Sequence, residues 1–199
     1  MKTSIDFLKN KSTVGIVAFF VVLLASIIFL STQSGMNGDE HYQSEHAENV
    51  LNYYRTFGND TAAVRHTPDW NLPLYGQVID NLASLVAKGL NIENYMLVRH
   101  IVCSIFGWLG ILFVSLMAFR VSGSRRAAVF AALLLFLSPR FLGHSFNNIK
   151  DISFATAMMM GVYYITLFLR QFPKPKKSTI IYLTISIAFA MAVRIPGIL

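Results

Sequence analysis

The sequence predicts an all-α membrane protein with about five transmembrane helices and, in its first outer loop, amphipathic helices on the membrane surface. Composition is the first reason: 54% of the 199 residues are apolar and 14% are charged, whereas a soluble domain carries about a quarter charged residues. Distribution is the second, because the apolar residues form runs near the ~20 residues that cross a bilayer. The predicted spans are 14–30, 97–119, 127–141, 152–169 and 179–193.

The first run also has features of a secretory signal, because lysines precede it and small polar residues follow it. Its apolar stretch is longer than the h-region of a signal peptide, and no small-x-small cleavage site follows. An uncleaved first span is therefore the favoured interpretation. The runs 14–30 and 127–141 are short for a span, so they depend on flanking residues or on a thin bilayer.

Basic residues set the orientation, because short loops rich in Lys and Arg stay in the cytoplasm. Three basic clusters alternate with the other loops and therefore fall on one side of the membrane. The sequence thus predicts a multi-pass protein of the plasma (inner) membrane with a cytoplasmic N-terminus, and with loops 31–96 and 139–151 on the periplasmic or outer side. The clusters are Lys2, Lys9 and Lys11; Arg120, Arg125 and Arg126; and Arg170, Lys174, Lys176 and Lys177.

The long outer loop contains two stretches with helical periodicity, 39–57 and 72–90. In each of them apolar residues recur at three- and four-residue spacing between polar ones, which predicts an amphipathic helix lying on the membrane. Gly58–Asn59–Asp60 and Thr67–Pro68–Asp69 supply the breaks between the two helices.

The net charge of +7 does not indicate a nucleic-acid partner. The Lys and Arg residues lie at the ends of hydrophobic runs, not along a stripe with interleaved aromatic residues. Their positive charge is therefore explained by the orientation of the spans in the membrane. Cys103 is the single cysteine and lies inside an apolar run, which excludes a disulfide within the chain.

Asp39, Glu40 and His41 follow the first span at the outer membrane surface. Adjacent carboxylates can act as a general base or hold a divalent cation, because one ionised group raises the pKa of the other. The plain alternative is a solvated helix start, where acidic residues favour the positive end of the helix dipole. His41 and Glu45 share a helical face, but without a third fixed ligand the indication for a metal is weak, and no metal site is predicted.

A second group of polar residues lies at the membrane boundary between the third and fourth runs. Ionisable groups at that depth are costly unless they pair or face water, which favours a functional role. The alternative is local: Asp151 or Asn148 caps the fourth span, and Lys150 reaches outward to the interface. Arg194 ends the fifth span, and its guanidinium suits the phosphate of a membrane lipid or of a lipid-linked substrate. The group comprises Arg140, His144, Asn147, Asn148, Lys150 and Asp151.

Five short motifs occur in order along the chain: Gly38–Asp39–Glu40, Tyr75–Gly76, Arg99–His100, Ser138–Pro139 and Asn147–Asn148–Ile149–Lys150–Asp151. Their order and topological placement resemble the C-superfamily of membrane glycosyltransferases. The closest likeness is to glycosyltransferase family 39, the protein O-mannosyltransferase and aminoarabinose-transferase type. The last motif looks like the Asn-Pro-Lys-Asp segment of bacterial members, with Ile149 where proline is common.

The resemblance implies that residues 1–199 form the N-terminal transmembrane catalytic part of a larger glycosyltransferase. Such an enzyme transfers a sugar, with inversion, from a polyprenyl-phosphate donor to a protein, lipid or glycan acceptor at the non-cytoplasmic face. Membrane lipids are further partners, and no cofactor is expected beyond a weakly bound divalent cation. Asp39 would be the catalytic base, Glu40 would orient the acceptor or support Asp39, and Lys150 and Arg194 would neutralise the departing phosphate. The expected substrate-binding residues are His41, His144, Asn147, Asn148, Lys150, Asp151 and Arg194.

The main alternative is a permease, flippase or scaffold subunit. Transporters place polar groups near the bilayer midplane, whereas the ionisable residues here gather at the outer ends of the apolar runs. That distribution favours chemistry at the membrane surface. A lipid-phosphate phosphatase or ligase would need an Arg or His cluster suited to a phospho-enzyme, which we do not find in the sequence.

Overall fold

The computed structural model describes residues 11–65 and 75–194, and these segments form helices joined by short connections. No strand occurs within these two segments, which confirms the predicted all-α class. The elements are α2 (Lys11–Ser31), α3 (Glu40–Arg55), the 3-10 helix η1 (Ala62–Val64), α4 (Val78–Gly89), α5 (Tyr95–Ser122), α6 (Arg125–Phe136), α7 (Pro139–Asn147), α8 (Ile149–Gln171) and α9 (Lys177–Val193).

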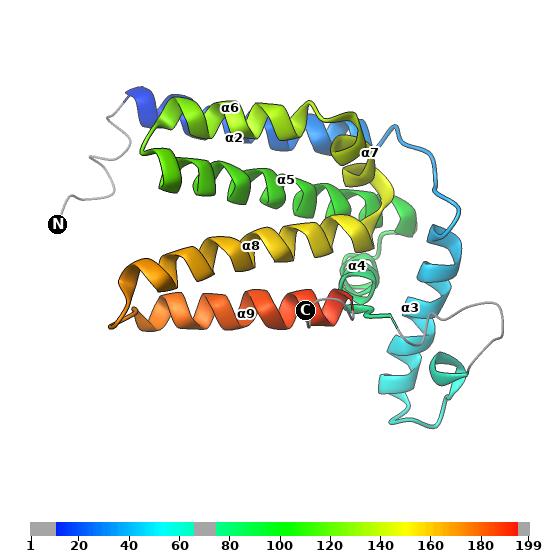
Figure 1. Ribbon diagram of the computed structural model, residues 1–199. Helices are drawn as coiled ribbons and strands as arrows, with labels where there is room; N and C mark the ends of the chain where they lie inside the picture. Colours follow the sequence, from blue (N-terminus) through cyan, green and yellow to red (C-terminus); the bar gives the residue numbers. More distant parts are fainter. Residues whose placement is uncertain (1–10, 66–74, 195–199) are drawn as a thin grey trace.

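The long helices run along one another in a bundle (Figure 1). α5 is its central element, because it contacts α2, α6 and α7 on one side and α8 on the other, and α9 packs against α8. Within 11–65 and 75–194, three helices are long and apolar enough to cross a membrane: α2 from residue 13, α5 and α8. The bent pair of α6 and α7 passes the same test when taken together, whereas α9 is apolar but has 17 residues. Length and composition thus support three or four of the five predicted spans, and the exact number stays a prediction.

The third predicted span, 127–141, is not one straight helix. α6 ends at Phe136, and α7 begins at Pro139 after a bend of 68°. Proline explains the break, because it lacks a backbone N–H and disfavours the helical conformation of the residue before it; Ser138 is accordingly extended, with ψ of 113°. Proline also suits the first position of a helix. The interpretation of 139–151 as a loop is therefore wrong: this segment is α7 and the first turn of α8.

Two glycines of α5 allow α7 and α8 to lie close against it. A Cβ added at Gly107 would lie 2.4 Å from the hydroxyl oxygen of Ser145 in α7, and one at Gly110 would lie 2.9 Å from Oγ1 of Thr156 in α8. Small residues of this kind let helix backbones approach each other in membranes. The approach fixes the corner between α7 and α8 relative to α5.

α3 and α4 cross the end of the bundle instead of running along it (Figure 1). They correspond to the predicted amphipathic helices 39–57 and 72–90. Residues 72–74 of the second helix and the predicted break Thr67–Pro68–Asp69 lie outside the described segments. α4 contacts α3, α5, α8 and α9. Apolar side chains of α4, α5, α8 and α9 form one core at this end of the bundle. That core includes Ile79, Ala83, Val98, Val102, Ile149, Ile152 and Val193.

Candidate functional site

A buried ion cluster joins α3, α4 and α5 at this end of the bundle. The Arg99 side chain has no solvent exposure. Its Nη1 donates to Glu40 Oε1 (2.5 Å), and its Nη2 donates to Asp80 Oδ1 (3.0 Å) and to Gln43 Oε1 (2.5 Å). The planar guanidinium suits this arrangement because it holds five N–H donors in a fixed fork. We refer to Glu40, Gln43, Asp80, Arg99 and His100 as the Arg99 cluster.

Glu40 is fully buried in this cluster, and both of its carboxylate oxygens have protein partners. Oε1 also lies 3.0 Å from His100 Nε2, and Oε2 accepts a hydrogen bond from the Asn37 N–H (2.7 Å). Burial raises the pKa of Glu40, but the hydrogen bonds from His100 and Asn37 and the charge of Arg99 outweigh burial, so the pKa lies below its ordinary value. At Asp80 burial prevails and raises the pKa above its ordinary value, although Arg99 lowers it.

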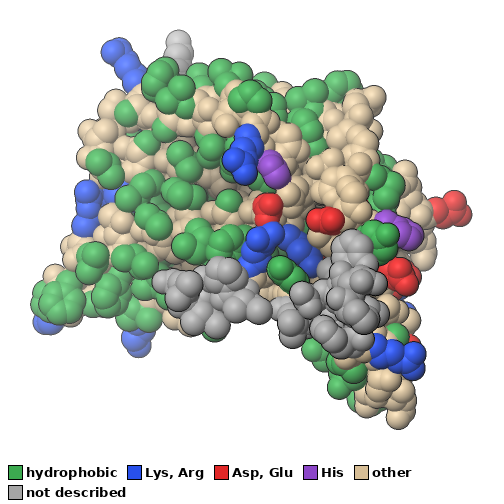
Figure 2. All heavy atoms as spheres, turned by 45° about the vertical axis from the view of Figure 1, so that its right-hand side comes forward, with side chains coloured by type: hydrophobic (Ala, Val, Ile, Leu, Met, Phe, Trp, Pro, Cys, Tyr) green, Lys and Arg blue, Asp and Glu red, His purple; other side chains and the backbone are tan. Residues whose placement is uncertain are grey.

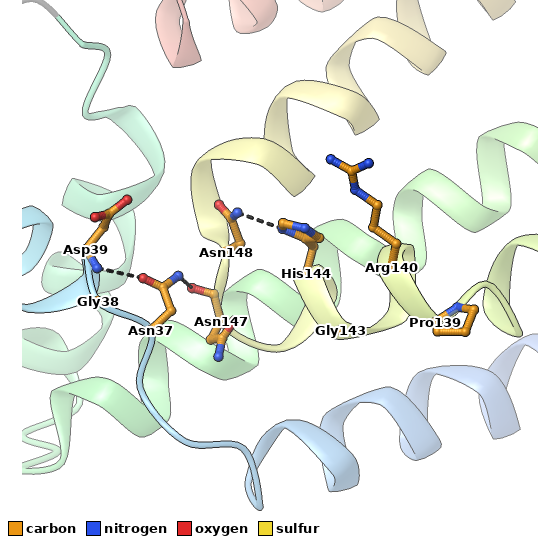
Figure 3. A pocket seen from close by; sticks show the side chains of 9 residues that line it. All are labelled: Asn37, Gly38, Asp39, Pro139, Arg140, Gly143, His144, Asn147 and Asn148. Carbon is orange, nitrogen blue, oxygen red and sulfur yellow. Dashed lines mark hydrogen bonds between the residues drawn. The ribbon is translucent and has the colours of Figure 1, made fainter.

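Asp39, next to this cluster, lines a polar cavity of about 500 Å³ (Figure 3). Its carboxylate is exposed and makes no helix-capping hydrogen bond, although Asp39 occupies the N-cap position of α3. Its backbone N–H donates to Asn37 Oδ1 (2.8 Å), and Asn37 Nδ2 donates to the Asn147 carbonyl oxygen (3.3 Å). The loop before α3 is thereby tied to the end of α7. The cavity is lined by Asn37, Gly38, Asp39, Pro139, Arg140, Gly143, His144, Asn147 and Asn148.

The corner between α7 and α8 forms the other side of this cavity. Asn148 caps α8, because its Oδ1 accepts a hydrogen bond from the Asp151 N–H (3.3 Å), as the local alternative for this residue predicted. Asn148 Nδ2 donates to Asp151 Oδ2 (2.8 Å) and lies 2.7 Å from His144 Nδ1. Asp151 forms an ion pair with Arg194 at the end of α9. These contacts fix the orientation of His144 and connect the cavity to α9.

Lys150, in the first turn of α8, is 4% exposed. Its ammonium has no hydrogen-bond partner among the residues that the structure describes, although it lies 5.5 Å from the centre of the Tyr75 ring and the charges of Asp80 and Arg194 act on it. The local alternative required Lys150 to reach outward to the interface, and its burial shows that it does not. A buried ammonium without a hydrogen bond is the kind of group that needs a functional explanation.

Tyr75 lies beside Lys150 in a segment that rests on the last turn of α9. A Cβ at Gly76 would lie 1.8 Å from the Ala192 carbonyl oxygen, so a larger residue would displace the segment and Tyr75 with it. On the α3 side, the buried His46 has a pKa below its ordinary value, because burial disfavours the charged imidazole and the positive charge of Lys150 adds to that effect.

Figure 2 shows the face to which the ends of these helices belong. Lys and Arg, Asp and Glu, and His side chains gather near the middle of this face, while hydrophobic side chains cover much of the surrounding surface. Further charged and His side chains lie toward the right-hand edge of the same view, so charged groups extend across this face.

The structure brings most of the predicted site residues to this end but divides them between two places. His41 belongs to neither: it is exposed on α3, lies edge-on to Tyr42 and does not line the cavity. The metal alternative at His41 and Glu45 gains no support, because within 11–65 and 75–194 no three His, Cys, Asp or Glu side chains are grouped to hold a metal ion. The cavity is lined by Asp39, His144, Asn147 and Asn148 among others, whereas Lys150, Asp151 and Arg194 do not line it.

Sequence reasoning missed Gln43 and Asp80 as members of the Arg99 cluster. A signal existed for Asp80, because an acidic residue adjoins the buried Ile79 within an amphipathic stretch. Arg99 gave another signal, since an ionisable residue inside a predicted span is a functional candidate. Nothing in the sequence pairs these side chains, because they come from three separate helices.

The family model for dolichyl-phosphate-mannose-protein mannosyltransferases matches residues 73–199. The match covers more than half of the chain and includes Arg99, Lys150 and Arg194, whereas Asp39 and Glu40 precede it. No curated protein and no solved structure matched the chain. The family implies an integral membrane glycosyltransferase with a polyprenyl-phosphate sugar donor, which confirms the resemblance described above. The chain therefore belongs to the dolichyl-phosphate-mannose-protein mannosyltransferase family.

Proposed function

We propose that this chain catalyses the inverting transfer of a sugar from a polyprenyl-phosphate donor to an acceptor hydroxyl at the outer face of the membrane. The acceptor class is a protein, lipid or glycan. The observation that carries the proposal is the Asp39 carboxylate, which is exposed on the wall of a polar cavity and has no hydrogen bond or ion pair among the described residues. A carboxylate that the protein itself does not use is available to a substrate.

In the proposed reaction the acceptor oxygen attacks the anomeric carbon of the donor sugar as Asp39 takes the hydroxyl proton. A new carbon–oxygen bond forms, and the bond between the anomeric carbon and the phosphate oxygen breaks. The sugar leaves the lipid with inverted configuration, and the departing polyprenyl phosphate gains one negative charge. Atoms and charge balance without a metal ion or a cofactor.

Lys150 is the residue that we assign to the departing phosphate. Fixed positive donors stabilise charge that develops on a leaving group, and they do so most strongly where water is excluded. The Lys150 ammonium is buried and has no hydrogen-bond partner within the described segments. Arg194 is already paired with Asp151, so it contributes through its Nε, which has no partner among the described residues.

Glu40 acts in this proposal as a positioning residue, not as a group that touches the acceptor. Its bonds to Arg99 and to the Asn37 N–H hold the start of α3, and Asp39 is the preceding residue. The catalytic role predicted for the acidic pair thus divides between an exposed base and a buried support.

The test is single-turnover transfer from a polyprenyl-phosphate sugar by the complete protein in membranes. Asp39→Asn keeps the shape of the side chain but cannot accept the proton, so turnover should fall by about 10² to 10⁴, with donor binding retained. Glu45→Gln, which neutralises an exposed acid on the same helix, is the matched control and should transfer at the wild-type rate. A wild-type rate for Asp39→Asn would exclude Asp39 as the base.

The outer location has its own test, thiol labelling in intact cells. A cysteine placed at Asn59 should react with a membrane-impermeant reagent, and one at Ser124 should not, because the basic clusters predict opposite sides for these positions. The native Cys103 is fully buried and gives a low background. Labelling at Ser124 alone would reverse the topology and remove Asp39 from the outer face.

A further inference from the structure

A second cavity, of about 590 Å³, opens between α3, α4 and the start of α5. We refer to it as the α3–α4 pocket. It shares no lining residue with the cavity that Asp39 lines, and the proposed transfer reaction uses none of its residues. It is lined by Glu48, Arg55, Ser84, Ala87, Lys88, Asn91, Ile92, Glu93 and Tyr95.

Charges of both signs line this pocket. Glu48 of α3 and Lys88 of α4 form an ion pair (3.4 Å). Arg55 is the last residue of α3, and Glu93 lies in the turn between α4 and α5. The side chains of Arg55 and Glu93 are exposed and form no ion pair within the described segments. The pocket therefore offers one cation and one anion to a ligand that carries both charges.

Ser84 adds a buried polar group to the wall of the pocket. Its side chain is 1% exposed, and its hydroxyl has no hydrogen-bond partner in the described part of the chain. Other buried helical serines donate to the carbonyl oxygen four residues earlier, as Ser145 and Ser186 do at 2.8 and 2.7 Å. For Ser84 that oxygen belongs to Asp80, and it accepts a hydrogen bond from the nearby Tyr95 hydroxyl (3.4 Å). A buried hydroxyl without a partner beside a cavity indicates that a ligand completes it.

The pocket lies at the boundary of the membrane. Tyr95 is the first residue of α5, which is long and apolar enough to cross a bilayer, and tyrosine is typical of the level of the lipid headgroups. Apolar side chains adjoin the charged ones: Leu90, at the end of α4, is 67% exposed, and Ile92 is 38% exposed. A polar pocket with an apolar margin at this depth fits a lipid better than a water-borne peptide.

We propose that the α3–α4 pocket binds the headgroup of phosphatidylethanolamine, a phospholipid with a phosphate and a primary ammonium. The Arg55 guanidinium pairs with the phosphate, and the ammonium donates hydrogen bonds to the Glu93 carboxylate. Ser84 donates to a phosphate oxygen, and Leu90 and Ile92 contact the acyl chains. This binding is independent of the proposed glycosyl transfer.

The chemistry of the pocket separates this headgroup from those of other phospholipids. A primary ammonium has N–H donors for a carboxylate, whereas the trimethylammonium of phosphatidylcholine has none. Phosphatidylglycerol has a phosphate for Arg55 but no cation for Glu93. Free glycerophosphoethanolamine has the same headgroup but lacks the acyl chains.

The experiment titrates the complete protein in detergent with four probes: short-chain phosphatidylethanolamine, phosphatidylcholine and phosphatidylglycerol, and glycerophosphoethanolamine. Bound lipid is counted by native mass spectrometry, and the melting temperature is followed in parallel. We expect phosphatidylethanolamine to bind saturably, to raise the melting temperature, and to bind about 10-fold more tightly than each of the other three probes.

Three variants test the assigned contacts. Glu93→Gln should weaken binding of phosphatidylethanolamine about 5- to 10-fold and bring it to the level of phosphatidylcholine, because only the ammonium of the former donates to Glu93. Arg55→Gln should weaken binding of both lipids by a similar factor. Ser84→Ala should weaken both about 3-fold, without lowering the melting temperature of the lipid-free protein. Glu45→Gln, at an exposed acid of α3 outside the pocket, should change no affinity.

Four outcomes would overturn the inference. Equal wild-type affinity for phosphatidylethanolamine and phosphatidylcholine would mean that the ammonium is not recognised. Wild-type binding by both Glu93→Gln and Arg55→Gln would place the lipid elsewhere. Equal affinity for glycerophosphoethanolamine would assign the pocket to a free zwitterion. A peptide that lost affinity in Glu93→Gln while lipid binding stayed unchanged would assign it to a protein partner. Sugar transfer by the wild-type protein is measured separately, so failure of the lipid inference leaves the proposed function standing.

Discussion

The Arg99 cluster and Lys150 lie at the same end of the bundle but differ in the hydrogen bonding of their buried charges. In the Arg99 cluster every charged group has a partner: Arg99 bonds Glu40 and Asp80, and Glu40 also bonds the Asn37 N–H. The Lys150 ammonium, by contrast, is buried without a hydrogen bond among the described residues.

The difference in hydrogen bonding distinguishes charges that stabilise the fold from a charge that is available to a ligand. Buried charges that are fully paired hold helices together, because removing one partner strands the other. Buried polar groups that stay unpaired weaken the fold and are retained where a ligand completes them. Burial alone therefore does not mark a functional site; the state of hydrogen bonding does.

Arg99→Met tests most directly whether the paired charges of the Arg99 cluster stabilise the fold. The variant keeps the length of the side chain but leaves Glu40 and Asp80 buried without their counter-charge. We expect the free energy of unfolding to fall by about 3 to 5 kcal/mol, measured as denaturation of the protein in detergent. Arg55→Met, at an exposed arginine of α3, is the control and should change it by less than about 0.5 kcal/mol. A loss as small as that of the control would mean that the cluster does not hold α3 and α4 on the bundle.

Lys150→Met should have the converse effect. Binding of polyprenyl phosphate should weaken by about 2 to 5 kcal/mol, the cost of losing one partner of a desolvated charge pair. Stability in the absence of donor should not fall, because no hydrogen bond is removed. Equilibrium binding and thermal unfolding on the same preparations check both parts. Lys88→Met, at a lysine of α4 in an exposed pair with Glu48, should leave both unchanged. Reduced stability with unaltered donor affinity would make Lys150 a structural residue.

Glu40→Gln tests whether the stabilising contribution of the Glu40 carboxylate depends on pH. The folded pKa of Glu40 lies below its ordinary value, so the charged carboxylate stabilises the fold above the unfolded pKa, and this contribution is lost as the pH falls through the folded pKa. We expect the wild-type protein to exceed the variant by about 1.5 to 3 kcal/mol above about pH 5, and the advantage to shrink in more acidic solution. The measurement is the difference in unfolding free energy at each pH. An advantage that grew on acidification would reverse the assigned sign.

Particular residues show how far sequence reasoning reached. Asp39 was predicted as an outer carboxylate at the start of a helix, and it lies on the wall of a cavity with His144 and Asn148. Glu40 belongs to the same motif, yet its burial was not predictable from the sequence. A residue in the first turn of a helix can face the solvent or the protein, and the contact with Arg99 in α5 turns Glu40 inward. Lys150 was expected at the membrane boundary, but its burial and its lack of a hydrogen-bond partner among the described residues depend on tertiary packing.

The sequence by itself determined the all-α membrane class, the helices α3 and α4 after the first span, and the membership of Arg99, Lys150 and Asp151 in motifs of one family. Hydrophobic runs and helical periodicity are local properties, so they can be read along the chain. Only the tertiary structure decided which charges are paired. The break at Pro139 turned an expected loop into α7. The contacts among α3, α4, α5, α8 and α9 placed one arginine between two carboxylates and left one lysine without a hydrogen bond in the described part of the chain. Pairing joins residues far apart in the chain, and no local pattern records it.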